Sequence, residues 1–367
     1  MDVFDAARLT FSTDYAAARQ KFLAAARTAG ARVASYDNPN KGPLGEALAT
    51  DCAWIGPADA PKVLMLVSAT HGVEGFCGSG AQIDWMLNER DTLAPDTAAI
   101  VVHAINPYGF SWIRRVTEEG VDLNRNFVDF TKPLPENPGY DELADAILPP
   151  ALEGPAREAA DKKLAAFREK NGATAIAVAI SGGQYKHPKG LFFGGAGPTW
   201  SQKTLGRIFD DFDLAKRRHL AMIDYHTGLG PHGYGELISV HFPETPAAAR
   251  AKRWWGDNVT EPLAGTSVAG ARHGFISRLA EARLGDNVTF IAIEYGTYPS
   301  DTVVRPALRA DHWLHANTNA AWDAPQTKAI KAQIRKAFYP DTQDWHESVL
   351  FRSRQTLRMA LAGLTTV

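Results

Sequence analysis

The chain has 367 residues, 45% of them hydrophobic and 22% charged, so it can bury a large core. With 39 Lys and Arg against 41 Asp and Glu, its net charge of -2 gives no general attraction to nucleic acid or to an anionic membrane. The start of the chain lacks the features of a secretory signal, and no apolar run approaches the roughly 20 residues that cross a bilayer. We therefore expect a cytoplasmic protein without nucleic-acid or membrane partners, and its oligomeric state remains open.

The first part of the chain reads as a helix followed by a β-turn-α-β unit. Apolar positions at helical spacing predict a helix over residues 12–30. The apolar run at 61–68, bounded by turn residues, predicts a strand buried on both faces. A glycine-rich turn at 72–80 leads into a further helical pattern, and residues 98–104 predict the next strand.

The rest of the chain alternates in the same way. Two more buried strands are predicted at 219–225 and 288–294, and helices at 302–318, 324–338 and 342–363. This alternation predicts an α/β fold with a mixed, mostly parallel central sheet and helices on both faces. We expect one domain over residues 1–367, with a helical N-terminal extension (about 1–45), a Pro-, Glu- and Ala-rich insertion (about 131–172) and C-terminal helices (about 302–365).

A histidine and a glutamate follow the first buried strand directly. His71-Gly-Val-Glu74 lies at the carboxyl end of that strand, where open α/β sheets place their ligand sites. An imidazole and a carboxylate three residues apart can bind one zinc ion if the backbone turns sharply, and Gly72 and Gly75 permit such a turn. Taken alone, this His-x-x-Glu pattern is a weak signal.

Two other strand ends supply the groups that a catalytic metal site would still need. A catalytic zinc takes three protein ligands, and His226, at the end of the strand 219–225, is the best third candidate. Glu294 ends an apolar strand just before Gly296, where a carboxylate could activate water as a general base. The alternative for Glu294 is an ordinary surface charge.

A polar loop between these strands concentrates arginines and asparagines. The run from Arg114 to Phe127 contains three arginines and two asparagines around a short turn. Guanidinium groups can bind a carboxylate with two hydrogen bonds and can stabilise an oxyanion. A solvated surface loop would have the same composition.

Four separated motifs, taken together, are far more specific than any one of them. They are His71-x-x-Glu74, Gly120-Val-Asp-Leu-Asn-Arg-Asn126, His226 and Glu294, in this order. In this order the chain resembles the zinc carboxypeptidase superfamily over residues 60–300, in particular a bacterial branch related to the aspartoacylase and succinylglutamate desuccinylase group. The resemblance implies a zinc carboxypeptidase-like fold.

The resemblance also implies a role for each motif. His71, Glu74 and His226 would bind Zn²⁺, and Glu294 would be the catalytic base. Asp122 would support His71 from behind, while Asn124 and Arg125 would hold the substrate's terminal carboxylate. Arg115 would polarise the scissile carbonyl, with Arg114 as a close competitor. The family's tyrosine on a mobile loop has no counterpart here, because no Tyr lies between Tyr234 and Tyr295.

The function implied is a zinc-dependent hydrolase that cleaves an amide bond next to a free carboxylate. A carboxypeptidase acting on small peptides is the first hypothesis, and a deacylase of N-acyl amino acids is the second. A metal-binding scaffold without activity is a third, which the presence of Glu294 disfavours.

Overall fold

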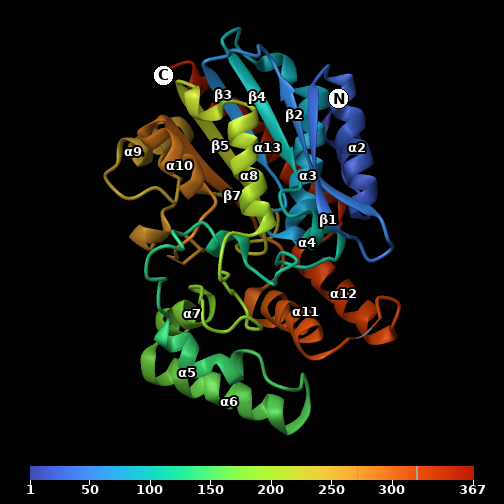
Figure 1. The fold of residues 1–367 in the computed structure, drawn as a ribbon, viewed down its shortest axis with the longest axis vertical. Coiled ribbons are helices and arrows are strands. Elements are labelled where there is room, and N and C mark those ends of the chain that lie inside the picture. The colour runs from blue at the N-terminus through green and yellow to red at the C-terminus, as the bar shows by residue number, and fades with distance from the viewer. Residues whose placement is uncertain (271, 320) are drawn as a thin grey trace.

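A seven-stranded sheet runs through the computed structural model, which describes residues 1–270, 272–319 and 321–367 (Figure 1). The strands are β1 (Arg32–Lys41), β2 (Ala47–Ile55), β3 (Lys62–Val67), β4 (Thr97–His103), β5 (His219–Thr227), β6 (Gly235–Ile238) and β7 (Val288–Tyr295). Their order is β1-β2-β4-β3-β5-β7-β6. The four central strands are parallel to one another, while β1, β2 and β6 pair antiparallel at the two sides. The predicted mixed sheet with a parallel centre is confirmed.

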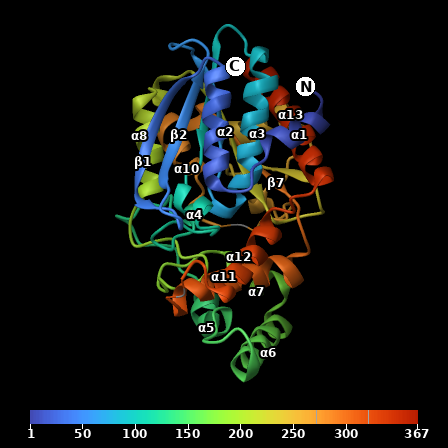
Figure 2. The ribbon, with the colours of Figure 1, turned by 90° about the vertical axis from the view of Figure 1, so that its right-hand side faces the viewer.

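Helices cover both faces of this sheet (Figures 1 and 2). They are α1 (Val3–Thr10), α2 (Tyr15–Thr28), α3 (Gly75–Asn88), α4 (Pro107–Ser111), α5 (Pro138–Ile147), α6 (Gly154–Asn171), α7 (Ala173–Ser181), α8 (Trp200–Asp211), α9 (Pro246–Trp255), α10 (Ser277–Leu284), α11 (Arg305–Asn317), α12 (Pro325–Phe338) and α13 (Gln343–Leu364). None of those within the described residues has both the length and the hydropathy that a bilayer crossing needs.

The central strands feed two separate cores because their side chains alternate between the faces. Leu64 and Leu66 of β3 pack with α1, α2, α3, α9 and α13, whereas Val63 and Met65 pack on the other face with α8 and α10. Every residue of β3, β4 and β5 is buried. Burial on both faces explains why these strands are continuous apolar runs in the sequence.

The two strands at the N-terminal side of the sheet were missed. The expected helical extension over residues 1–45 contains strand β1, which pairs antiparallel with β2. In β1 most side chains are exposed or partly exposed, and the strand includes Pro39, so its sequence lacks the apolar pattern that reveals the central strands. The pairing that makes it a strand comes from β2, not from its own composition.

A third apolar cluster lies beyond the carboxyl ends of the parallel strands. Helices α5, α6 and α7 form a group at the bottom of Figure 1, next to α11 and α12. Buried residues of α5 and α7 join those of α11 and α12 in this cluster, together with Val73 from the loop after β3. The segment expected to be an insertion, 131–172, contains α5 and α6.

Helix α3 fixes the position of the loop that precedes it. Gly78 lies so close to the sheet that a Cβ there would stand 2.6 Å from Ser68 and 2.9 Å from Tyr225. On its other side α3 is tied to α13, because Arg354 donates two hydrogen bonds, of 2.8 and 2.7 Å, to the buried Asp84 carboxylate. Glu74, which directly precedes α3, is therefore held from both sides of the helix.

We expect Arg354→Met to lower the free energy of unfolding by about 2–4 kcal/mol, because it leaves the buried Asp84 charge without its cation. Urea unfolding followed by circular dichroism would measure the change. Lys163→Met is the control: it removes an ion pair with Asp145 at the surface, which should contribute less than about 1 kcal/mol. Equal, small effects of the two substitutions would contradict the role given to this pair.

Candidate metal and catalytic site

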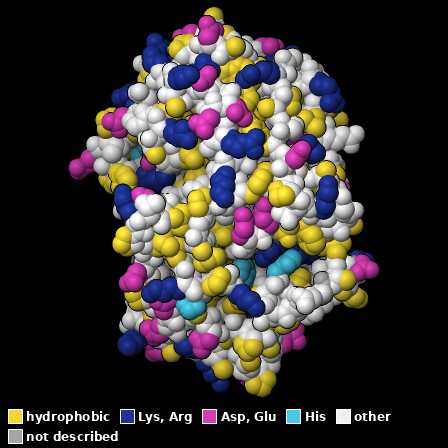
Figure 3. Space-filling view, in the orientation of Figure 1, with side chains coloured by type: hydrophobic (Ala, Val, Ile, Leu, Met, Phe, Trp, Pro, Cys, Tyr) yellow, Lys and Arg dark blue, Asp and Glu magenta, His cyan; other side chains and the backbone are white. Residues whose placement is uncertain are grey.

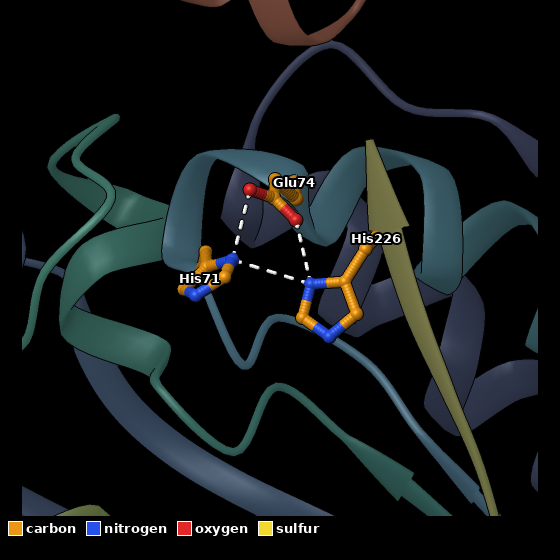
Figure 4. Close-up of side chains that lie close together, drawn as sticks. All are labelled: His71, Glu74 and His226. Atoms are coloured by element: carbon orange, nitrogen blue, oxygen red, sulfur yellow. Dashed lines mark hydrogen bonds and ion pairs between the residues drawn. The ribbon is translucent and has the colours of Figure 1, made fainter. Parts of the chain in front are cut away.

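Two imidazoles and one carboxylate converge at the carboxyl ends of β3 and β5 (Figure 4). Nδ1 of His71 lies 2.9 Å from one oxygen of Glu74, and Nδ1 of His226 lies 2.9 Å from the other. The two Nδ1 atoms are 3.2 Å apart. Of the His, Cys, Asp and Glu side chains in the described residues, this is the only group of three or more placed to hold one metal ion.

The convergence follows from the local fold. β3 and β5 are parallel neighbours, so the residues that follow their carboxyl ends meet at one edge of the sheet. After β3 the chain turns through Ala69, whose φ of 60° lies in the left-handed region, and then through a 3-10 turn at Gly72–Glu74. Gly72 is required there because a Cβ would collide with the backbone of Gly109. The sharp turn expected between His71 and Glu74 is present.

The three side chains fit a divalent metal better than they fit one another. If both Nδ1 atoms donate hydrogen bonds to Glu74, two N–H groups face each other across 3.2 Å, which is unfavourable. A cation between them would instead use both lone pairs and the carboxylate, which is a donor set that zinc accepts. All three residues are buried, with at most 4% of each exposed, so their polar atoms depend mainly on one another or on a bound ion for partners.

Each imidazole is also held at its second nitrogen by an aspartate. Nε2 of His71 lies 3.2 Å from Asp122, and Nε2 of His226 lies 2.6 Å from Asp224. A carboxylate in this position fixes the tautomer that leaves Nδ1 free for a metal. Burial lowers the pKa of His226, but Asp224 and Glu74 outweigh it and raise the pKa well above its ordinary value.

Arg115, and not Arg114, reaches the ligand residues. The Arg115 guanidinium donates to Glu74 at 3.1 Å and to Asp122 at 3.0 Å, and its third nitrogen lies 2.8 Å from Nε2 of His71. Burial raises the pKa of Glu74, yet the His71 and His226 imidazoles lower it to well below its ordinary value. Arg114 points elsewhere, with its Nε 3.8 Å from Asp311 of α11.

Glu294 stands beside the ligands on the next strand. In the parallel pairing of β5 with β7 it is the direct partner of His226. One of its oxygens accepts a hydrogen bond of 3.0 Å from the Leu229 backbone N–H, and the residue is 9% exposed. Burial and the nearby Glu74 charge raise the pKa of Glu294 to about 7. A carboxyl group with this pKa can both accept and release a proton near neutrality.

Asn124 and Arg125 lie close to the ligands but are largely engaged with the protein. The Asn124 side-chain oxygen accepts a hydrogen bond from the Ile276 N–H, and its nitrogen lies 3.3 Å from Nε2 of His226. Arg125 is fully buried and donates to the carbonyl oxygens of Asn124 and Ser181. The expected site residues are thus gathered in one place, with differing freedom to meet a substrate.

Two residues of this site were not identified from the sequence. Asp224 precedes His226 by two positions on a strand and so shares its face, which is a signal that could have revealed it. Arg272 lies in the loop before α10, in a stretch without any motif. Burial lowers the pKa of Arg272 to about 9, and the nearby Arg125 and Arg115 guanidinium groups lower it further.

The family of the chain follows from its sequence. A family model described as "Protein of unknown function (DUF2817)" matches residues 11–352. The chain belongs to this family. No curated protein matches it. The matched range of this DUF2817 chain includes all the residues of the site.

Solved structures similar to this DUF2817 chain include two carboxypeptidases and an aspartoacylase family protein. Carboxypeptidase A from Helicoverpa armigera is 14% identical, with 95% of this chain and 74% of that chain covered and a TM-score of 0.46. A metallo-carboxypeptidase from Burkholderia cenocepacia is 13% identical, with coverage of 92% and 69% and a TM-score of 0.41. An aspartoacylase family protein from Mesorhizobium loti is 17% identical, with coverage of 78% and 66% and a TM-score of 0.33.

We expect Asp224→Asn to weaken metal binding about 10- to 100-fold, because the imidazole of His226 loses the carboxylate that holds its tautomer. Titration of metal-stripped protein with zinc would measure the affinity, and elemental analysis the stoichiometry, which should be about one ion per chain.

The matched control is Asp344→Asn, because Asp344 also contacts a histidine, His232 at 3.3 Å, but at the surface. It should bind zinc as the native chain does, whereas His226→Ala should bind none tightly. An unchanged zinc affinity in Asp224→Asn would contradict the role assigned to this carboxylate.

Proposed function

We propose that the chain is a zinc-dependent hydrolase that cleaves an amide bond next to a free carboxylate, in the manner of a carboxypeptidase. The observation that carries the proposal is the convergence of His71, Glu74 and His226, with Glu294 as the strand partner of His226. Three buried ligands and a neighbouring carboxylate with a raised pKa form the minimum set for metal-assisted hydrolysis. A purely structural zinc site takes four protein ligands and needs no such base.

Zinc bound by these three side chains would acidify a water molecule and polarise the substrate carbonyl. Glu294 would accept the proton of the attacking water and then deliver it to the leaving nitrogen. Both steps require a carboxyl group whose pKa lies near the working pH, and burial gives Glu294 that property. The hydrogen bond from the Leu229 N–H orients one carboxylate oxygen and leaves the other to meet the water.

Arg115 would stabilise the negative charge that develops on the carbonyl oxygen. When Nδ1 of His71 is used for a metal, its proton resides on Nε2 and is donated to Asp122. The Arg115 nitrogen that lies 2.8 Å from this Nε2 then faces an N–H group and has no acceptor there. Its N–H groups are therefore available to a substrate oxygen that comes within reach, while the other two nitrogens remain bound to Asp122 and Glu74.

The same groups would cleave a small peptide or an N-acyl amino acid, since both contain an amide bond next to a free carboxylate. A panel of dipeptides and N-acetyl amino acids separates the two substrate classes. Each compound is compared with its C-terminal amide, which lacks the free carboxylate. Hydrolysis of the dipeptides supports the carboxypeptidase proposal, and hydrolysis of only the N-acetyl compounds identifies a deacylase. A chain that binds zinc but cleaves none of them is a scaffold.

Glu294→Gln should retain zinc and lose about 10²- to 10⁴-fold in kcat, because the amide cannot accept a proton. Turnover of the best compound of the panel and zinc content would be measured on the same preparation. Glu236→Gln is the control, since Glu236 is buried and is the partner of Glu294 on β6. Equal activity in the native and Glu294→Gln chains would remove Glu294 from the role of base.

The activity should rise with pH on the acidic side, because Glu294 must be deprotonated to act as a base. Without a metal its pKa is about 7, and a cation nearby lowers the pKa of a carboxyl group. We therefore expect the midpoint of the acidic limb of kcat/KM between the ordinary value of 4.5 and about 7. A profile that falls as pH rises through this interval would contradict the assignment.

A further inference from the structure

Arg125 is enclosed by the protein on every side that the structure describes. Its two terminal nitrogens donate to the carbonyl oxygens of Asn124 and Ser181, at 3.1 and 2.6 Å. Gly183, with a φ of 98°, covers the aliphatic part of the side chain, where a Cβ would stand 2.7 Å from Arg125 Cδ. The guanidinium also lies 5.5 Å from the centre of the Phe192 ring. A substrate carboxylate could reach it only if these contacts were broken.

The loop before α10 lies directly on the Asn124–Arg125 turn. The Phe127 N–H donates to the Gly274 carbonyl oxygen at 3.3 Å, and the Ile276 N–H donates to the Asn124 side chain at 2.9 Å. A Cβ on Gly274 would stand 2.8 Å from Arg125 Cα, which shows how closely the two backbones approach. Arg272, two residues before Gly274, is therefore carried to the metal site by a loop that is anchored to the site's own residues.

Arg272 differs from the other two arginines of the site in having no ion-pair partner among the described residues. Its Nε donates to the Gly270 carbonyl oxygen at 2.9 Å, and its guanidinium lies 5.9 Å from the centre of the Phe275 ring. No carboxylate of residues 1–270, 272–319 or 321–367 lies within ion-pair distance of it.

The electrostatic surroundings of Arg272 favour an added anion. The charged groups that act on it most strongly are the Arg125 and Arg115 cations and, with the opposite sign, Asp122 and Glu294. Asp122 is already bound to Arg115, at 3.0 Å, and Glu294 is needed as the base. A partly buried cation beside two other cations is stabilised when a negative group binds.

We propose that Arg272, rather than Arg125, binds the free carboxylate of the substrate, and that Arg125 instead holds the turn that positions Asp122 and Asn124. The inference rests on the proposed function for the identity of the anion. The proposal places the substrate carboxylate on the side of the site formed by the loop before α10. No carboxylate of the described residues is paired with Arg272 there. Substrates with a free carboxylate are then preferred over their amides because of Arg272.

The test measures binding separately from turnover. Zinc-loaded Glu294→Gln protein, with and without Arg272→Met, would be titrated by calorimetry with N-acetylalanine, alanylalanine and the C-terminal amide of each. We expect Arg272→Met to weaken carboxylate binding about 10- to 100-fold and to leave binding of the amides unchanged. Arg272→Lys should recover part of the loss. In the chain with Glu294 intact, KM should rise by the same factor while kcat changes little.

The matched control is Arg283→Met, which removes an exposed arginine of α10 that is paired with Asp210. It should bind both classes of compound as the native chain does. Arg125→Met should lower thermal stability more than Arg272→Met does. If Arg272→Met binds the carboxylates as tightly as the native chain does, or if the native chain does not distinguish them from the amides, the inference is wrong. Failure of all turnover, with Arg272-dependent binding retained, would refute only the proposed function.

Discussion

The carboxylate of Glu74 lies between two imidazole nitrogens, and the other residues of the site contact this group of three side chains. Both of its oxygens are engaged, one by His71 and Arg115 and the other by His226 and the Thr227 N–H. A buried charge is tolerated only when it is paired and hydrogen-bonded in this way. Replacing one of the charged or imidazole partners of Glu74 would therefore leave part of its buried charge unpaired.

The sheet explains why such a charged cluster can exist inside an apolar protein. β3 and β5 are buried along their whole length and end at the same edge, and Asp224 and His226 lie near the carboxyl end of β5. The helices on both faces keep water from the strands, and the helical group around α5, α7, α11 and α12 lies beyond that edge (Figure 1). Histidine side chains also occur in a hollow of the surface in that region (Figure 3). His312 and His315 line a cavity of about 490 Å³ with Arg114 and Lys189, and none of the three candidate metal ligands contributes to its lining.

The sequence predicts the parts of the molecule in which local composition and burial agree. The four parallel strands were predicted because each is apolar on both faces, and the predicted C-terminal helices match α11, α12 and α13. The antiparallel strands β1, β2 and β6 were not predicted. The edge strand β1 has no such pattern and exists through its pairing with β2. The candidate metal ligands could be named because strand ends of a parallel sheet meet at a known place.

Other features of the site depend on orientation, which a motif does not determine. The Asp-x-Asn-Arg run places Arg125 beside the site, but the direction of its guanidinium is decided by Ser181, Gly183 and Phe192, which follow it by more than fifty residues. Arg272 belongs to a loop that has no recognisable motif. Its position depends on the backbone contact between Gly274 and Arg125, which the sequence does not reveal. The motif can thus be present while, in our proposal, the charge that binds the substrate is supplied by another loop. In this chain the unpaired cation Arg272 is then a better guide to the proposed substrate than the Asp-x-Asn-Arg motif beside the site.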